Sequence, residues 1–192
     1  MEQIFSNNSI DLQVLREFCE REGEAMSYRK GDQMEREGDP SHWFGFVAEG
    51  CFKYVTHEIS SDREHITWFS FEGEYVGDYP SCLNGSPAQT TIEAMLPSRV
   101  LRVTGEQMLK LFRQNTDKME LRSIIAEHLL SQARRSYLEL HRSSARERYE
   151  LLLHRCPGIV EHLSLNAISS FLSITPQMLS KIRKNITFDT HQ

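Results

Sequence analysis

Residues 164–184 carry polar side chains whose spacing suits contact with DNA, on what the apolar pattern predicts to be two short helices. Ile168, Phe171 and Leu172 fall at helical spacing, so they bury one face of the first helix. Thr175 and Pro176 suit the N-cap and the first position of a second helix. The second helix begins with and exposes the residues that we predict to contact DNA: Thr175, Gln177, Ser180, Lys181 and Lys184.

This arrangement is typical of a helix-turn-helix, whose second helix enters the major groove of DNA. We expect Gln177 and Lys181 to contact bases, because Gln pairs with adenine and Lys with guanine. We expect Thr175, Ser180 and Lys184 to contact phosphates. An ordinary helical hairpin with a solvated basic face has a similar pattern and is the competing interpretation.

The turn between the two helices departs from the usual pattern at one position. Ser173 stands where helix-turn-helix units often have Gly. A left-handed backbone conformation at this position would strain Ser, because its Cβ meets the backbone there.

The composition excludes several other classes of protein. No apolar run approaches the ~20 residues that a membrane-spanning helix needs. The start of the chain lacks the basic and apolar regions of a signal peptide, so we predict a cytoplasmic protein with no membrane partner. Four cysteines, Cys19, Cys51, Cys82 and Cys156, lie far apart without a C-x-x-C motif, so we expect reduced thiols and no bound metal.

The net charge of −5 is unusual for a DNA-binding protein, but it is unevenly distributed. Residues 143–192 contain six Lys and Arg residues against four Asp and Glu residues, which gives +2 and leaves −7 for the remainder. Mild positive charge in one segment is weak support for DNA binding there, because many DNA-binding domains are far more basic.

Residues 25–104 change from helical periodicity to alternation with a period of two, interrupted by frequent turn signals. The clearest alternating run is 51–57, and further short strands are expected at 44–50, 66–71, 90–94 and 99–103. Strands this short, at this spacing, predict an antiparallel barrel or jelly roll.

Four motifs in this region follow an order that resembles the Crp–Fnr family of bacterial transcription regulators. They are Lys30-Gly31-Asp32, Glu37-Gly38-Asp39, Phe46-Val47-Ala48-Glu49-Gly50 and Phe71-Glu72-Gly73-Glu74. The resemblance implies an α+β fold with an N-terminal antiparallel β-roll of the cyclic-nucleotide-binding type, a long dimerisation helix and a C-terminal all-α helix-turn-helix domain. The family then adds a two-stranded wing. Residues 185–192 are too few for one, so we expect the wing to be truncated or absent.

The resemblance also implies a ligand pocket that begins at Phe71-x-Gly73-Glu74, where family members bind a cyclic nucleotide and an Arg grips its phosphate. Ala88 stands at the position of that Arg, and no Arg or Lys occurs between Arg63 and Arg99. A buried phosphate without a cation is poorly compensated, so we predict no tight binding of cAMP or cGMP. The pocket for an unknown small-molecule effector is predicted at Gly73, Glu74, Tyr75, Val76, Gln89, Thr90 and Thr91.

Cofactor chemistry finds no support in the pattern of metal-binding residues. The iron–sulfur type of this family needs several Cys near the start of the chain, and only Cys19 is there. His42, His57 and His65 fit surface positions better than haem ligation. A cupin-like enzyme would need a His-x-His pair, which the chain lacks. We therefore predict no cofactor and no enzymatic activity.

Residues 116–142 read as one uninterrupted helix with an apolar stripe at alternating steps of four and three. Such a stripe is the 3.5-residue seam of a two-helix coiled coil, and the family resemblance implies a homodimer through the same helix. The stripe could instead pack on the β domain, although a neighbouring set, Leu121, Ile124, Ile125 and Leu129, is available for that. The predicted dimer interface consists of Met119, Ser123, Ala126, Leu130, Ala133, Tyr137 and Leu140.

These features divide the chain into a sensor domain at 1–115, a dimerisation helix at 116–142 and a DNA-binding domain at 143–192. They predict a homodimeric transcription regulator that binds palindromic double-stranded DNA under the control of an effector other than cAMP. The resemblance adds RNA polymerase as a candidate partner. The alternative interpretation is a small-molecule-binding or protein-interaction module whose DNA binding has weakened.

Overall fold

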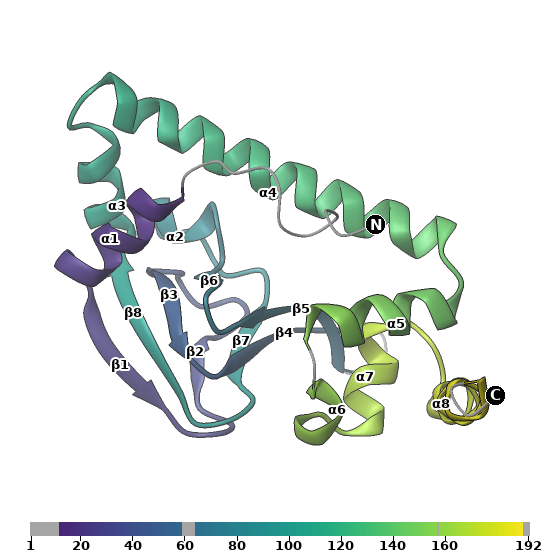
Figure 1. The fold of residues 1–192 in the computed structure, drawn as a ribbon. Helices are drawn as coiled ribbons and strands as arrows, with labels where there is room; N and C mark the ends of the chain where they lie inside the picture. Colours follow the sequence, from purple (N-terminus) through teal and green to yellow (C-terminus); the bar gives the residue numbers. More distant parts are fainter. Residues whose placement is uncertain (1–11, 59–63, 157, 190–192) are drawn as a thin grey trace.

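The computed structural model describes residues 12–58, 64–156 and 158–189. Two four-stranded antiparallel sheets form the N-terminal part, with strand orders β1-β8-β3-β6 and β2-β7-β4-β5 (Figure 1). The strands are β1 Glu24–Tyr28, β2 Gln33–Glu35, β3 Trp43–Glu49, β4 Cys51–His57, β5 Glu64–Phe71, β6 Tyr75–Gly77, β7 Thr91–Ala94 and β8 Ser98–Thr104. With helices α1–α3 they make up what we call the β domain.

The two sheets face each other across an apolar core. Val47, Phe52, Ile92 and Val100, from four different strands, are fully buried between them. Alternating side chains of an antiparallel strand point to opposite faces, so each strand supplies the core with every second residue. The predicted antiparallel β-roll is therefore confirmed.

The eight helices of the described residues divide into those that cover the β domain and those that follow it. The first group is α1 Gln13–Glu22, α2 Ser81–Asn84 and α3 Gly105–Phe112, and the long helix α4 spans Thr116–Arg142. The second group, which we call the C-terminal helical domain, is α5 Ala145–Arg155, α6 Ile159–His162, α7 Leu165–Phe171 and α8 Pro176–Asp189. No strand follows α8 in the part of the chain that the structure describes.

Helix α4 runs along the β domain toward the C-terminal helical domain, and its first half packs on the β domain (Figure 1). Leu121 and Ile125 are buried there, in a cluster with Phe44, Met108 and Phe112. These are members of the apolar set that the sequence offered for packing on the β domain. The stripe predicted for dimerisation thus lies on another face of the helix.

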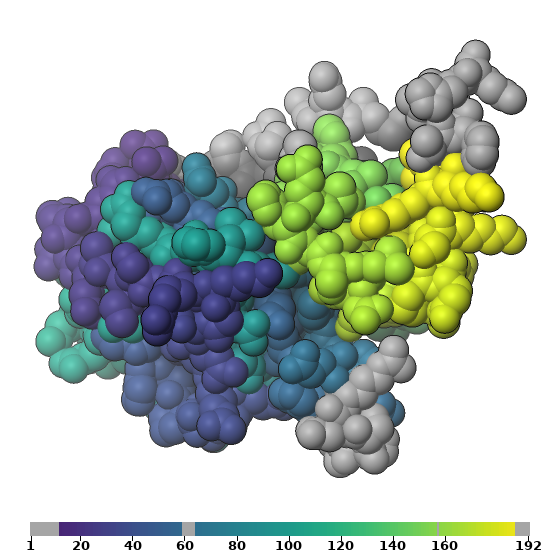
Figure 2. All heavy atoms as spheres, turned by 90° about the horizontal axis from the view of Figure 1, so that it is seen from below, coloured from purple at the N-terminus to yellow at the C-terminus, as the bar shows by residue number. Residues whose placement is uncertain are grey.

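The C-terminal helical domain does not form a separate core. One apolar cluster joins Val55, Ile66 and Phe69 of β4 and β5 to Ile168 and Leu179 of the helices. Figure 2 shows the C-terminal helices, green to yellow, packed directly against the blue strands. The two parts of the chain are therefore held together by a shared hydrophobic interior, which burial of apolar area stabilises.

Candidate nucleic-acid interface and sensor pocket

The five residues predicted to contact DNA lie at the N-cap of helix α8 and along the helix. The Thr175 hydroxyl accepts a hydrogen bond from the Met178 N–H at 3.2 Å, which is an N-cap contact, and Pro176 is the first helical residue. Leu179 and Ile182 are buried and hold the helix on its neighbours. The outward face is polar, and all five predicted contact residues are exposed: Thr175, Gln177, Ser180, Lys181 and Lys184.

The turn that joins α7 to α8 has the left-handed conformation anticipated from the sequence. Ser173 has φ 54°, the only positive φ of a non-glycine residue among the described residues. Its N–H donates to the Ser170 carbonyl at 3.0 Å, and the Ile174 N–H donates to the Ser169 carbonyl at 3.0 Å. These two bonds close the turn and fix the angle between the helices, at the expense of strain on Ser173.

Helix α5 supports this pair of helices from behind. Ser144 and Glu147 have the three-residue spacing from which the sequence predicts a capping box, and they form it at the start of α5 with both reciprocal hydrogen bonds present. Arg148 donates to the Leu172 carbonyl at 3.0 Å and to the Ser143 carbonyl at 2.6 Å, so it ties the turn to the end of α4. The Arg148 side chain thus connects the turn before α8 to the end of the long helix α4.

The predicted dimer stripe on α4 is exposed along its whole length in the single chain. Met119, Leu130, Tyr137 and Leu140 are 61%, 70%, 64% and 43% exposed. The smaller members Ser123, Ala126 and Ala133 are also exposed. An exposed apolar stripe this long on one helix is typical of an interface with another chain.

The predicted effector pocket is brought together only in part. Gly73 and Glu74 lie on the turn between β5 and β6, and the Glu74 carboxylate accepts a hydrogen bond from the Phe71 N–H at 3.1 Å. Val76 is buried in the core between the sheets. Tyr75 points the other way and donates its hydroxyl to the Leu12 carbonyl at 2.6 Å. Tyr75 and Val76 therefore serve packing.

The other predicted pocket residues lie on the segment from Gln89 to Thr91, and two of them have hydrogen-bond partners within the chain. The Asp78 carboxylate accepts a hydrogen bond from the Gln89 N–H, and Thr91 accepts one from the Glu37 N–H at 3.0 Å. Thr90 is half-buried beside them, and Ala88 is buried. The Gln89 N–H is thus already bonded to an anionic side chain.

A polar network between β4, β5 and β6 is also complete without a ligand. The Gly77 N–H donates to the Tyr54 hydroxyl at 3.1 Å, and Tyr54 pairs with Ser70 at 3.1 Å. Ser70 in turn donates to the Tyr75 carbonyl at 2.7 Å. Burial raises the pKa of Tyr54 to about 12, so its hydroxyl stays protonated and can donate to Ser70.

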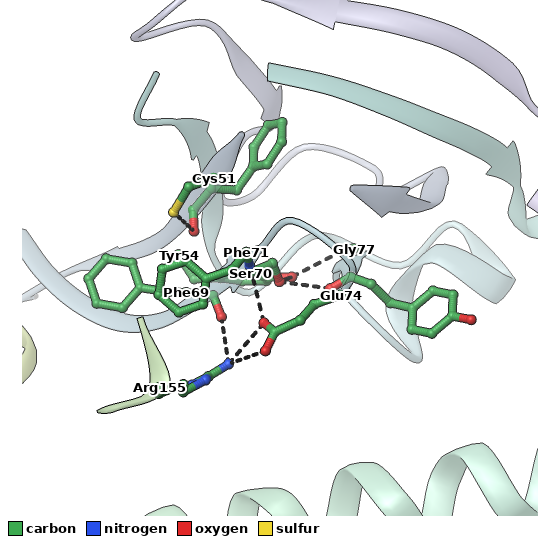
Figure 3. Close-up of polar contacts among 10 residues, drawn as sticks. Cys51, Tyr54, Phe69, Ser70, Phe71, Glu74, Gly77 and Arg155 are labelled. Atoms are coloured by element: carbon green, nitrogen blue, oxygen red, sulfur yellow. Dashed lines mark hydrogen bonds and ion pairs between the residues drawn. The ribbon is translucent and has the colours of Figure 1, made fainter. Parts of the chain in front are cut away.

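Sequence reasoning missed two residues of this region, Asp78 and Arg155. Arg155, at the end of α5, donates to both Glu74 carboxylate oxygens at 3.1 Å and 2.9 Å (Figure 3). It supplies the cation that the pocket segment itself lacks. Its only sequence signal is a basic residue in the last turn of a helix, which is common, and 81 residues separate it from Glu74.

Comparison with known protein families agrees with the fold of the β domain. Residues 25–115 match the family model of the cyclic nucleotide-binding domain. No curated protein matches the chain in sequence. In the described part of the chain, no helix is both long enough and apolar enough to cross a membrane.

Solved structures match most of the chain. FixK2 from Bradyrhizobium japonicum superimposes with a TM-score of 0.75 at 19% identity, over 88% of this chain and 86% of that chain. The c-di-GMP-responsive global regulator CLP from Xanthomonas campestris has a TM-score of 0.64 at 17% identity, over 94% and 93%. A Crp/Fnr-family transcriptional regulator from Eubacterium rectale has a TM-score of 0.66 at 12% identity, over 92% and 83%.

Together the domain match and the fold place the chain among proteins with a cyclic-nucleotide-binding-like domain, a long helix and a helix-turn-helix domain. This is the architecture of the Crp–Fnr regulators, and the predicted resemblance to that family is confirmed.

Proposed function

We propose that this chain is a homodimeric transcription regulator that binds a palindromic DNA operator through α8. The observation that carries the proposal is the outward polar face of α8, on which Gln177 and Lys181 stand exposed above a buried apolar face. Gln and Lys are residue types that read adenine and guanine in the major groove. Thr175, Ser180 and Lys184 flank them and supply phosphate contacts.

The exposed stripe on α4 supports the homodimer. Two copies that pair their α4 helices through Leu130 and its neighbours place two α8 helices on the same side of the dimer. A two-fold dimer of this type reads two half-sites about 34 Å apart, which is one turn of DNA. The small residues Ala126 and Ala133 in the stripe allow the two helices to approach closely.

The β domain, in this proposal, is controlled by an effector that is not a cyclic nucleotide. Ala88 provides no cation, Asp78 places a negative charge on the Gln89 N–H, and Glu74 is paired with Arg155. The Asp78 and Glu74 contacts would both have to be lost before a phosphate and a ribose could bind. Regulation through RNA polymerase is an extension of the same proposal and is suggested by the architecture alone.

In vitro selection tests the DNA-binding part of this proposal. The purified protein is incubated with random duplex DNA at about 50 mM and about 200 mM salt, since phosphate contacts weaken steeply over that range. We expect enrichment of a palindrome at both concentrations. Lys30→Ala, which removes a charge from a distant turn, serves as the control and should select the same palindrome.

Failure to enrich any sequence at the lower salt concentration would contradict the proposal for the unliganded protein. Enrichment of a single half-site without a palindrome would contradict the dimer and leave the helix-turn-helix assignment in place. Titration with cAMP and cGMP, followed by thermal unfolding, should leave the unfolding temperature unchanged, because the phosphate position holds no cation.

A further inference from the structure

Arg155 joins the C-terminal helical domain to the turn that carries Glu74. One guanidinium nitrogen of Arg155 lies 3.1 Å and 2.9 Å from the Glu74 carboxylate oxygens and 3.3 Å from the Phe69 carbonyl (Figure 3). The guanidinium carbon lies 4.5 Å from the Trp68 ring centroid and 5.2 Å from that of Phe71. Three kinds of contact therefore converge on one side chain: an ion pair, a carbonyl hydrogen bond and two cation–π contacts.

The burial of this pair distinguishes it from an ordinary surface ion pair. The Arg155 side chain is 12% exposed and that of Glu74 is 39% exposed. Exposed pairs contribute little to stability, but removing the partner of a mostly buried charge such as that of Arg155 leaves this charge uncompensated. Arg155 is the more buried partner, so loss of Glu74 is the change that the interface would resist most.

Other contacts continue the same interface along β5. The Ile66 N–H, on this edge strand, donates to the Ser170 hydroxyl of α7 at 3.2 Å. The rings of Phe69 and Phe171 lie 4.8 Å apart, centroid to centroid. The Glu74–Arg155 pair stands at one end of this row, where α5 ends and the predicted effector pocket begins.

The position of Glu74 gives the pair a second connection. Glu74 lies on a turn closed by a 2.9 Å hydrogen bond from its own N–H to the Phe71 carbonyl, with Gly73 at φ 84°. It belongs to the segment predicted to receive an effector. A ligand that binds the Glu74 carboxylate, or a movement of the turn that displaces this carboxylate, must break its contacts with Arg155.

We propose that Glu74 and Arg155 form a latch that docks the C-terminal helical domain on the β domain, and that signals reaching the Glu74 turn act by opening it. The docking is a property of the single chain. Its consequence for DNA rests on the proposed function: while the latch is closed, the β domain fixes the position of α8, and an open latch lets that position vary.

The docking is tested by Glu74→Gln, Arg155→Gln and the double variant. Gln at position 74 keeps an oxygen to accept the Phe71 N–H, so the turn retains its hydrogen bond while the charge is lost. The matched control is Glu72→Gln, which removes an exposed carboxylate from the same turn. Hydrogen exchange at the Ile66 amide reports docking. Exchange at the Ala94 amide, which is buried in the core between the sheets and donates to the Asp32 carbonyl at 2.9 Å, reports folding of the β domain.

A second readout comes from Trp68. The chain has two tryptophans, so Trp43→Phe leaves Trp68 as the single emitter. We expect each single latch variant to speed exchange at Ile66 by about tenfold and to shift Trp68 emission. Exchange at Ala94 should stay unchanged in these variants, and the Glu72→Gln control should change neither readout. The double variant should do no more than Arg155→Gln alone, because that variant already removes the Glu74–Arg155 interaction.

Unchanged exchange at Ile66 in Glu74→Gln would overturn the latch, whatever Trp68 does. An effect of Arg155→Gln without one of Glu74→Gln would also overturn it, because the docking would then depend on the carbonyl and ring contacts alone. A parallel rise in exchange at Ala94 would mean that the variant loosens the whole β domain, and would likewise contradict a local latch.

The consequence for DNA is measured separately, on palindromes whose half-sites are moved apart or together by one or two base pairs. The wild-type protein should prefer one spacing strongly, and Glu74→Gln should lose at least half of that preference on a logarithmic scale. An unchanged preference together with faster Ile66 exchange would overturn the regulatory role. Absence of any DNA binding by the wild type would contradict the proposed function and leave the exchange result standing.

Discussion

Lys181 stands exposed on α8 in the position from which a side chain can reach a base edge, and Lys184 lies one turn further along. We expect Lys181→Ala to relax sequence preference at one base pair of each half-site, with a loss of about 1–3 kcal/mol on the preferred sequence. Competition binding against single-base variants of the selected palindrome measures this. The substitution also removes the positive charge of Lys181, but the main expected change is in the discrimination between base pairs.

Lys184→Ala is the matched comparison, because it removes the same charge from the same helix. It should weaken binding to all duplexes about equally and reduce the slope of log affinity against log salt by about 1. If Lys181→Ala gave this uniform loss instead, Lys181 would be a phosphate contact and the assignment of the two residues would be wrong.

Ser173 adopts φ 54° in the turn before α8, where only glycine avoids a steric penalty. We expect Ser173→Gly to stabilise the protein by about 1 kcal/mol, since a left-handed conformation costs a residue with a Cβ roughly that much. Chemical denaturation monitored by circular dichroism measures the change.

Ser131→Gly is the control for Ser173→Gly, because Ser131 is exposed on the helical face of α4 outside the predicted stripe. The same substitution there should destabilise by about 0.5–1 kcal/mol, since glycine is unfavourable inside a helix. Destabilisation by both variants would mean that the turn tolerates Ser173 without strain.

At the scale of elements, α4 presents two apolar faces with different partners. Leu121 and Ile125 are buried against the β domain, whereas Leu130 is 70% exposed. We expect Leu130→Glu to convert the proposed dimer to a monomer, because two carboxylates would face each other at the seam. Analytical ultracentrifugation should show the halved mass, and circular dichroism should be unchanged.

Ser131, the residue that follows Leu130, provides a control in which the same glutamate side chain is introduced. Ser131→Glu places the same side chain on α4 outside the stripe and should leave the dimer intact. Dissociation by both variants would mean that α4 pairs through a different face. A dimer that survives Leu130→Glu would contradict the seam altogether.

Local signals in the sequence were sufficient to predict most elements of this chain. The capping box of Ser144 and Glu147 and the N-cap of Thr175 are formed as expected. Their partners are three residues away, so their chemistry is readable from spacing alone. The long helix spans Thr116–Arg142, the range predicted for it.

The contacts that define the pocket could not be predicted in this way. Asp78 reaches Gln89 across a loop, and Arg155 reaches Glu74 from a different domain. Both depend on how elements far apart in sequence are packed, and no periodicity encodes that. The family resemblance implied a ligand site at Gly73 to Val76, but the three-dimensional packing assigns Val76 to the core and Glu74 to an ion pair.

At the scale of the whole molecule, the β domain and the C-terminal helical domain share an apolar cluster. The helical domain is small, and much of its apolar surface faces β5. A small domain buries too little surface for high stability alone, so the interface contributes to the folding of both parts. We therefore expect calorimetry of the wild-type protein to show one cooperative transition rather than two.

Phe171 makes a ring contact across this interface with Phe69, at 4.8 Å between centroids. Phe171→Ala should cost about 2 kcal/mol, less than a fully buried Phe, and should split the transition in two, with the helical domain melting first. Phe112→Ala, in a different cluster of the β domain, is the control. It should cost about 3–5 kcal/mol and lower the unfolding temperature without splitting the transition. A single transition in Phe171→Ala would mean that contacts elsewhere, including the Glu74–Arg155 pair, are enough to couple the two parts.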